Sequence, residues 1–215
     1  MYKNSQYLRF SLMKRGFIMA TQVIDISCPG CGAPVSTSQE TCEYCDRPIV
    51  ISTFNSVSSM STLELNKYAS SYRKSLAEHP DNRELNTSVA ICYLKLRMFD
   101  EAYAAFSKAI VDNFDNSETY FYAAICLLKG KKAFLHQRPE IDKILELLNA
   151  AIMIEPRGIY YYFMAYIKFD YFKRKFLNVT PNYKDCLSRA QAAGYSNNDV
   201  NEFYAIAGVE KVNIV

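Results

Sequence analysis

The chain has 215 residues, of which 50% are hydrophobic and 22% are charged. This composition is typical of a folded globular protein and excludes a disordered chain. The net charge of +3 is too small to indicate nucleic-acid binding by itself, and no stretch approaches the roughly 18 apolar residues of a membrane span.

The first segment, residues 1–23, is basic. Lys3, Arg9, Lys14 and Arg15 are its charged residues up to position 20, and no acidic residue accompanies them. Its uncharged stretches are too short for the core of a signal peptide. We therefore expect a disordered basic extension, with Met19 as a candidate translation start.

Four cysteines follow as two Cys-x-x-Cys pairs, Cys28 with Cys31 and Cys42 with Cys45. A short hairpin between the pairs would bring all four thiolates around one ion. That ligand set favours tetrahedral zinc, and four protein ligands leave no open position for a substrate, so the spacing predicts one structural zinc ion. Iron bound by the same sulfurs is an alternative that the spacing leaves open.

The residues around these pairs, 26–34 and 42–49, resemble the short zinc-ribbon family. Asp46 stands where that family often has glycine after the second pair, and aspartate tolerates the left-handed backbone better than most residues. The resemblance predicts a zinc ribbon over residues 24–50. Residues 21–60 carry a net charge of −3, which disfavours binding to phosphates.

The remaining cysteines, Cys92, Cys126 and Cys186, lie in helical patterns among apolar residues. Cysteine in that setting is commonly a buried free thiol. Free thiols beside a four-thiolate site predict a reducing, cytoplasmic location.

Residues 51–60 are rich in serine and lack helical periodicity, so we expect a linker with few contacts. Ser61 and Glu64 then have the spacing of a capping box, which predicts a helix from residue 62 to about residue 78. Pro80 breaks this helix, and Asp81 is the expected cap of the next one.

Two further helices fit residues 83–115, with a break near Arg97. Their small and aromatic residues, counted from Arg83, fall where a tetratricopeptide (TPR) repeat has them. The matching residues are Ala90, Tyr93, Ala102, Phe106 and Ala109.

This pattern resembles the TPR family. A second unit begins at Ser117 and carries an insertion at 130–138, a weaker third unit begins at Gly158, and residues 197–206 are expected as a capping helix. The predicted fold is mainly α: a TPR-like helical-hairpin stack over 61–207, preceded by the zinc-ribbon hairpin and followed by a tail at 208–215. An isolated helical bundle is the structural alternative.

In the TPR family the concave groove binds a peptide or a helix of a partner protein. The resemblance carries thirteen groove positions onto this chain, which form an apolar trough with charged rims. They are Glu84, Thr87, Ile91, Leu94, Lys95, Glu118, Phe121, Ile125, Leu128, Lys129, Tyr162, Tyr166 and Phe169. The run Tyr160–Phe163 is so aromatic that we expect one of its faces to remain exposed as a partner surface.

No catalytic constellation is visible. Neither His79 nor His136 has a nucleophile and an orienting acid near it in sequence, and seven glycines form no glycine-rich loop. We therefore expect a non-enzymatic adaptor that binds a protein partner and has no membrane span, with nucleic-acid binding disfavoured. The alternatives are a nucleic-acid-associated zinc-ribbon factor and a regulatory subunit of an enzyme complex; the oligomeric state is open.

Overall fold

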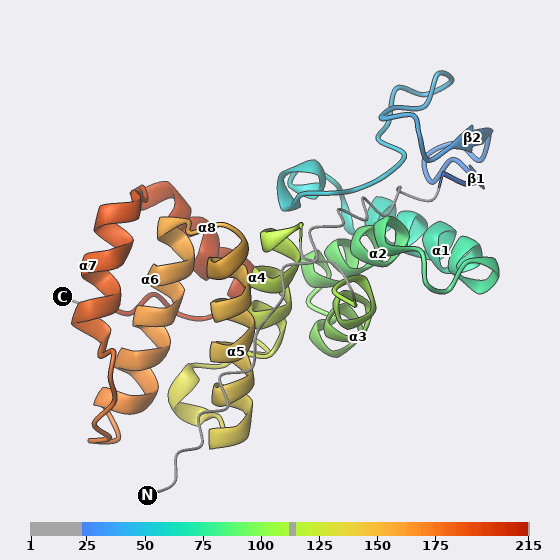
Figure 1. Ribbon diagram of the computed structural model, residues 1–215. Helices are drawn as coiled ribbons and strands as arrows, with labels where there is room; N and C mark the ends of the chain where they lie inside the picture. Colours follow the sequence, from blue (N-terminus) through green and yellow to red (C-terminus); the bar gives the residue numbers. More distant parts are fainter. Residues whose placement is uncertain (1–22, 112–114, 215) are drawn as a thin grey trace, which may run out of the picture.

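The computed structural model describes residues 23–111 and 115–214 (Figure 1). The expected basic extension therefore lies outside the described residues, apart from Val23. Strands β1 (Asp25–Ser27) and β2 (Pro34–Ser36) form an antiparallel hairpin in which Ile26 pairs with Val35. A short 3-10 helix, η1 (Phe54–Val57), separates this hairpin from the helical part.

The α-helices follow in chain order. They are α1 (Thr62–Glu78), α2 (Arg83–Lys95), α3 (Phe99–Ala109), α4 (Ser117–Cys126), α5 (Arg138–Ile154), α6 (Gly158–Ile167), α7 (Tyr183–Ala193) and α8 (Asn197–Ala207). A 3-10 turn, η2 (Ala133–Leu135), lies inside the expected insertion, and a π-helical turn, η3 (Lys168–Lys173), extends α6.

Side-chain caps explain where the helices begin. Glu64 N–H donates to Ser61 Oγ at 3.3 Å and Ser61 N–H donates to the Glu64 carboxylate at 3.0 Å, so the predicted capping box is present. At α2 the cap is Asn82, whose side-chain oxygen accepts from Leu85 N–H at 3.0 Å. The expectation that Asp81 caps this helix was wrong by one residue, because both residue types favour this position.

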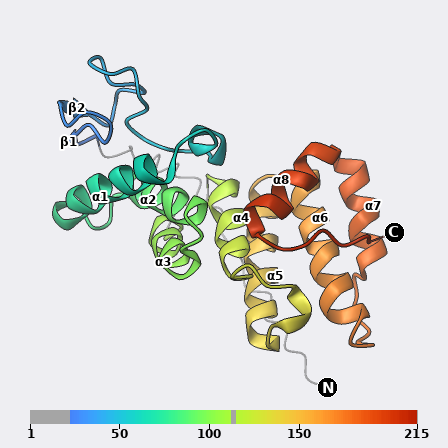
Figure 2. The same ribbon diagram turned by 180° about the vertical axis from the view of Figure 1, so that it is seen from behind.

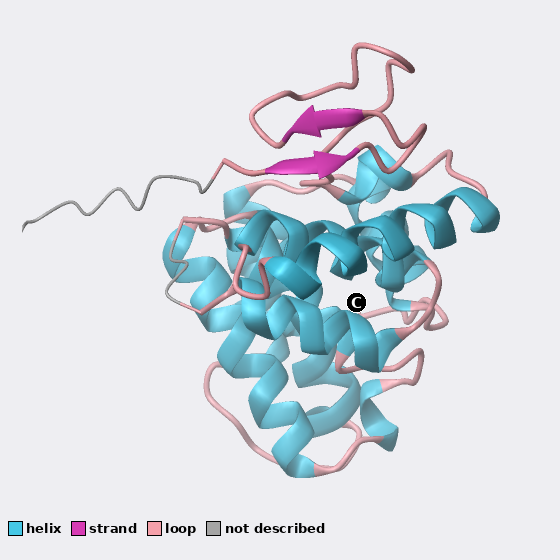
Figure 3. Ribbon diagram, turned by 90° about the vertical axis from the view of Figure 1, so that its right-hand side faces the viewer, coloured by secondary structure: helices cyan, strands magenta, loops and turns pink. Residues whose placement is uncertain are grey.

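The helices pair as antiparallel hairpins that stack in sequence order. Helix α2 packs on α3, α4 on α5 and α6 on α7, while α3 contacts α4 and α5 contacts α6. Helix α1 packs on α2 and forms the first layer, and the β-hairpin lies against this end of the stack (Figures 1 and 3). The predicted fold class, a mainly α TPR-like helical-hairpin stack preceded by a small β-hairpin, is confirmed.

Two turns depend on unusual backbone. The break between α2 and α3 falls at Arg97 as predicted, and this residue adopts a left-handed conformation with φ of 64° without being glycine. At the start of α6, a Cβ on Gly158 would overlap the backbone carbonyl of Gly194 at the end of α7. Only glycine allows these two helix ends to approach so closely.

The inner face of the stack is covered by the chain itself. The turn η1 contacts α2, and α8 lies beside α4 and α6 (Figure 2). The ring centroid of Phe203 on α8 lies 4.6 Å from the ring centroid of Phe163 on α6. Tyr160, Tyr162 and Phe163 are buried and Tyr161 is half-buried, so the expected exposed aromatic face is not present on this helix.

Residues 208–214 are packed rather than extended into solvent. Val209 and Ile214 are buried, and Glu210 forms an ion pair with Lys132 at 2.6 Å. The segment expected as a tail thus closes over the insertion between α4 and α5. Within the described residues, no helix has the length and apolarity needed to cross a membrane.

Candidate metal centre and concave cleft

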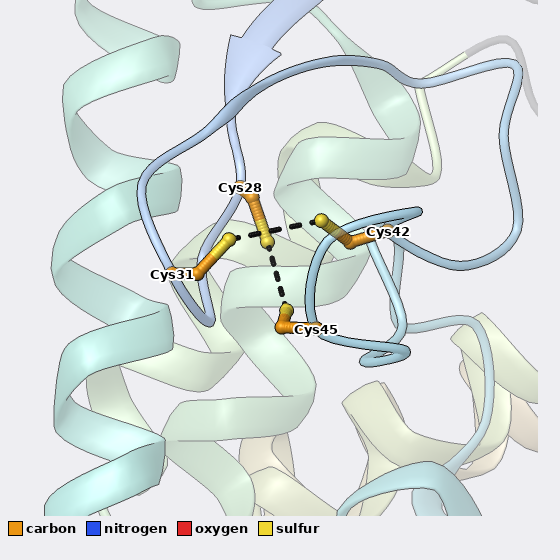
Figure 4. A group of neighbouring side chains, drawn as sticks. All are labelled: Cys28, Cys31, Cys42 and Cys45. Atoms are coloured by element: carbon orange, nitrogen blue, oxygen red, sulfur yellow. Dashed lines mark hydrogen bonds between the residues drawn. The ribbon is translucent and has the colours of Figure 1, made fainter.

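The structure brings the four predicted cysteines together (Figure 4). The Sγ atoms of Cys28 and Cys45 lie 3.7 Å apart, as do those of Cys31 and Cys42, and all four sulfurs lie within 4.8 Å of one another. Four sulfurs at about 2.3 Å from a tetrahedral zinc ion would be about 3.8 Å apart. A disulfide would need about 2.05 Å. The donor set therefore fits a metal ion and is not a pair of disulfides.

Two tight turns present the thiols. Cys28 N–H donates to the Ala33 carbonyl at 2.7 Å, and Gly32 N–H donates to the Cys28 carbonyl at 2.9 Å. In the second turn, Asp46 N–H donates to the Cys42 carbonyl at 2.8 Å. Asp46 has φ of 56°, the left-handed backbone that the second pair requires.

The thiols differ in how readily they ionise. Burial opposes ionisation of Cys28, but the backbone amides of Cys31 and Gly30 outweigh it and lower its pKa to about 7. At Cys45 the Arg47 amide favours the thiolate, yet burial and the neighbouring thiols together raise the pKa to about 12. Four negative charges at this spacing repel one another, and a divalent cation is what would relieve that repulsion.

Helix α1 holds the metal centre in place through side chains that point at the ribbon backbone. Tyr72 Oη donates to the Ile49 carbonyl at 2.9 Å, and Ser71 Oγ donates to the Ser27 carbonyl at 3.2 Å. Lys67 donates to the carbonyl of Gly30, inside the first Cys-x-x-Cys turn. The ribbon is therefore docked on the stack, not suspended from it.

The segment after the ribbon is also docked. Ile51, Phe54 and Val57 are buried, and the Ile51 backbone bonds to the side chain of Ser88 on α2. The expectation that residues 51–60 form a linker with few contacts was wrong. The signal was present in the sequence, since three apolar residues recur at a spacing of three among the serines.

The predicted groove residues lie on the inner helices, but most are covered by η1 and α8. The buried members are Thr87, Ile91, Leu94, Phe121, Ile125, Leu128, Tyr162 and Tyr166. Covered side chains of this kind stabilise the fold and cannot all serve a partner.

The remaining predicted groove residues have other neighbours. Lys95 donates to the Ser58 carbonyl at 3.2 Å, Glu118 pairs with Arg157 at 2.6 Å, and Lys129 pairs with Asp100 at 2.6 Å. Phe169 falls in the π-turn and packs edge-on against Tyr183. The π-turn moves Phe169 away from the predicted groove position, and sequence periodicity does not reveal such a turn.

Glu84 is the exception among the charged positions. One of its carboxylate oxygens is buried without a hydrogen-bond partner, and burial raises the pKa of this carboxyl group.

A cleft remains between η1 and α8. It has a volume of about 530 Å³ and is lined from three elements: Phe54 on η1, Leu94 and Lys95 on α2, and Ile206 with Asn198 on α8. A smaller hollow of about 120 Å³ adjoins it and shares Asn55, Glu202 and Ile206. These two hollows contain what is left of the predicted groove.

Arg97 also lines this cleft and joins the turn after α2 to α8. Its guanidinium donates to the carbonyls of Ile206 and Ala205, each at 2.7 Å, at the C-terminal end of α8. Guanidinium groups bind helix C-termini favourably, because unpaired carbonyls there carry partial negative charge.

The histidines add no catalytic geometry to either place. His136 is buried, with Nε2 3.0 Å from the Leu128 carbonyl oxygen and Nδ1 3.2 Å from the Glu140 carboxylate. Both ring nitrogens therefore have structural partners. His79 is the residue that ends α1, and it lines a separate hollow between α1 and the ribbon, together with Ser27 and Glu78.

No protein-family model matches the chain, and no curated protein matches it. Among solved structures it is similar to one described as MamA MSR-1 C2, with 17% sequence identity and a TM-score of 0.44. That likeness covers 66% of this chain and 68% of the other. At this TM-score the likeness supports no inference about function. The fold assignment rests on the helix pairing described above.

Proposed function

We propose that the protein is a non-enzymatic interaction scaffold of a reducing compartment such as the cytoplasm, which binds a segment of a partner protein in the cleft between η1 and α8. The observation that carries this proposal is the cleft itself, which lies on the inner face of a stack of helical hairpins. Its volume of about 530 Å³ accommodates a few side chains rather than a whole helix.

The lining of the cleft indicates the chemistry of the partner. The accessible lining is mostly polar: Asn55, Asn198 and Asn201 are exposed and Lys95 and Glu202 offer opposite charges, whereas Phe54, Leu94 and Ile206 are almost fully buried. An extended polar peptide that carries charges of both signs fits this arrangement.

The metal centre has a supporting role in this proposal. Cys28, Cys31, Cys42 and Cys45 would hold one zinc ion, which supplies a cross-link between the two turns and, with four protein ligands, no open position for chemistry. Because the ribbon is hydrogen-bonded to α1 and leads directly into η1, the ion would also fix one wall of the cleft.

Site-specific photo-crosslinking in the native host tests the proposal. A photoreactive residue at Asn198, an exposed position in the cleft lining, should capture a discrete protein partner that resists nuclease treatment. The same residue at Ala104, exposed on α3, is the matched control and should not capture that protein. Equal capture at both positions, capture only of nucleic acid, or no capture at Asn198 would contradict it.

A further inference from the structure

A second hollow lies away from the concave cleft, between α5, α6 and α7. Its volume is about 310 Å³. Its apolar lining comes from Leu145, Ile152 and Met164. Its cationic lining comes from Lys168, one helical turn after Met164, and from Arg189 on α7, and none of the residues that line the hollow is acidic.

Lys168 is the unusual member of this group. Only 8% of its surface is exposed, and within the described parts of the chain its amine has neither a hydrogen bond nor an ion pair. Its contact is with the face of the Phe172 ring, 5.0 Å away. Most of this side chain is removed from water without a carboxylate partner, and burial lowers the pKa of Lys168.

The nearby acid does not satisfy this amine. Asp142 is engaged by Arg138, whose Nε donates to both carboxylate oxygens at 2.7 and 2.9 Å. Arg138 also lies over the Phe172 ring, at 5.1 Å, so it adds positive charge near Lys168. Cys186, the remaining titratable group close to the amine, is buried with a raised pKa and is therefore a neutral thiol.

The rest of the lining supplies further donors. Arg189 has an exposed side chain with no ion-pair partner among the described residues. Asn149, Tyr161 and Thr180 contribute an amide and two hydroxyls to the same hollow. Two cations and three neutral donors that share one hollow with apolar side chains are complementary to an anionic head with an apolar body.

We propose that this hollow binds a small amphipathic anion, in which a carboxylate or phosphate group contacts Lys168 and Arg189 while an apolar body of about six carbons packs on Leu145 and Ile152. The volume is near the lower limit of about 300 Å³ for ligand sites, which restricts the ligand to this size. The site is separate from the cleft proposed for the protein partner and does not depend on it.

Calorimetric titration of the whole zinc-loaded protein with three probes tests the proposal. Hexanoate and hexyl phosphate share the apolar body and differ in the anion, and hexanamide has the same body without charge. Saturable binding of either anion, at least about tenfold tighter than of hexanamide, is the expected result, and the tighter anion identifies the source of the ligand. Equal binding of all three probes, or no binding of either anion, would overturn the proposal.

Variants locate the site. Lys168→Met removes this charge at nearly constant volume, so we expect the protein to fold. Its affinity for the anion should be at least about tenfold lower. Arg189→Met should also lower the affinity for the anion. Because Arg189 is exposed, this variant tests the site with little risk of unfolding the protein. Lys184→Met, which changes an exposed residue of α7 outside the hollow, is the matched control and should leave affinity unchanged.

The NMR chemical shift of a methyl group in the hollow reports binding directly, and a change in stability alone would not alter it. The methyl group of Met164 should shift in the NMR spectrum on addition of the anion, whereas that of Met153, which is exposed on α5, should not. A shift at Met164 that persists unchanged in both the Lys168 and the Arg189 variants would show that these cations do not hold the anion, and would overturn the assignment.

Discussion

The hydroxyl of Ser88 makes two hydrogen bonds to the backbone of one distant residue, Ile51. Ile51 N–H donates to Ser88 Oγ at 2.9 Å, and Ser88 Oγ donates to the Ile51 carbonyl at 3.1 Å. Both residues are fully buried. A single side chain on α2 thus satisfies both polar backbone groups of the residue that leads from the ribbon to η1.

We predict that Ser88→Ala destabilises the protein more than a serine-to-alanine exchange usually does. It leaves a buried N–H and a buried carbonyl without partners, and each such group costs about 1–3 kcal/mol. The free energy of unfolding, measured by denaturant titration, should therefore fall by about 2 kcal/mol or more. Ser107→Ala on α3, which has no such bond, should change it by less than about 0.5 kcal/mol; equal effects would show that Ser88 does not hold the segment.

Removal of the metal should destabilise more than the ribbon. The purified protein should hold about one zinc ion per chain by elemental analysis. Because Ser71 and Tyr72 bond to ribbon carbonyls, chelation should reduce hydrogen-exchange protection in α1 as well as in residues 24–50. A loss of protection confined to residues 24–50 would show that the ribbon and the stack are energetically independent.

The contact between the ribbon and α1 should respond to pH. The amide and hydroxyl of Ser61, together with Arg47, hold the pKa of Glu64 below its ordinary value of 4.5. A lowered pKa contributes stability that is present above about 4.5 and is lost as the pH falls through the lower, folded-state value. The stability difference between the protein and Glu64→Gln should therefore be constant at neutral pH and shrink in acid; a difference that grows in acid would contradict the assignment.

Arg97 should be necessary to hold the C-terminal end of α8 in place. Arg97→Ala removes two charged hydrogen bonds to helix carbonyls, and we expect a loss of about 1–2 kcal/mol together with faster amide exchange near Ile206. Lys108→Ala, at an exposed position of α3, is the control. Unchanged exchange in α8 would mean that aromatic packing alone retains this helix.

The close approach at Gly158 gives a steric test. Gly158→Ala places a methyl group against the Gly194 carbonyl, and the backbone must move to admit it. Although alanine usually favours a helix, we expect a net destabilisation of about 1–3 kcal/mol by thermal or chemical unfolding. A stabilised variant would show that α6 and α7 separate at little cost.

Local signals in the sequence predicted much of the fold. Ser61 with Glu64 marked the start of α1, and the spacing of the four cysteines predicted a cluster that the structure assembles. Such features act over a few residues, so they can be read from sequence alone.

Long-range relationships could not be predicted in the same way. The burial of Tyr162 and Tyr166 depends on α8 returning over the inner face, where both rings pack against Tyr204, and this is decided by tertiary packing rather than by helical periodicity. The π-turn at 168–173 likewise lacks a sequence signature, yet it places Lys168 in a hollow and removes Phe169 from the groove.

The bond between Arg97 and Ile206 joins residues 109 positions apart. A simple repeat array has contacts only between neighbours, so it can unravel from either end, one unit at a time. Here the last helix, α8, is hydrogen-bonded to Arg97 in the turn between α2 and α3, so unfolding from the C-terminus must break these bonds before α6 and α7 are released. The chain should consequently unfold in a single transition, and this contact between distant residues should make it fold more slowly than an open array of equal length.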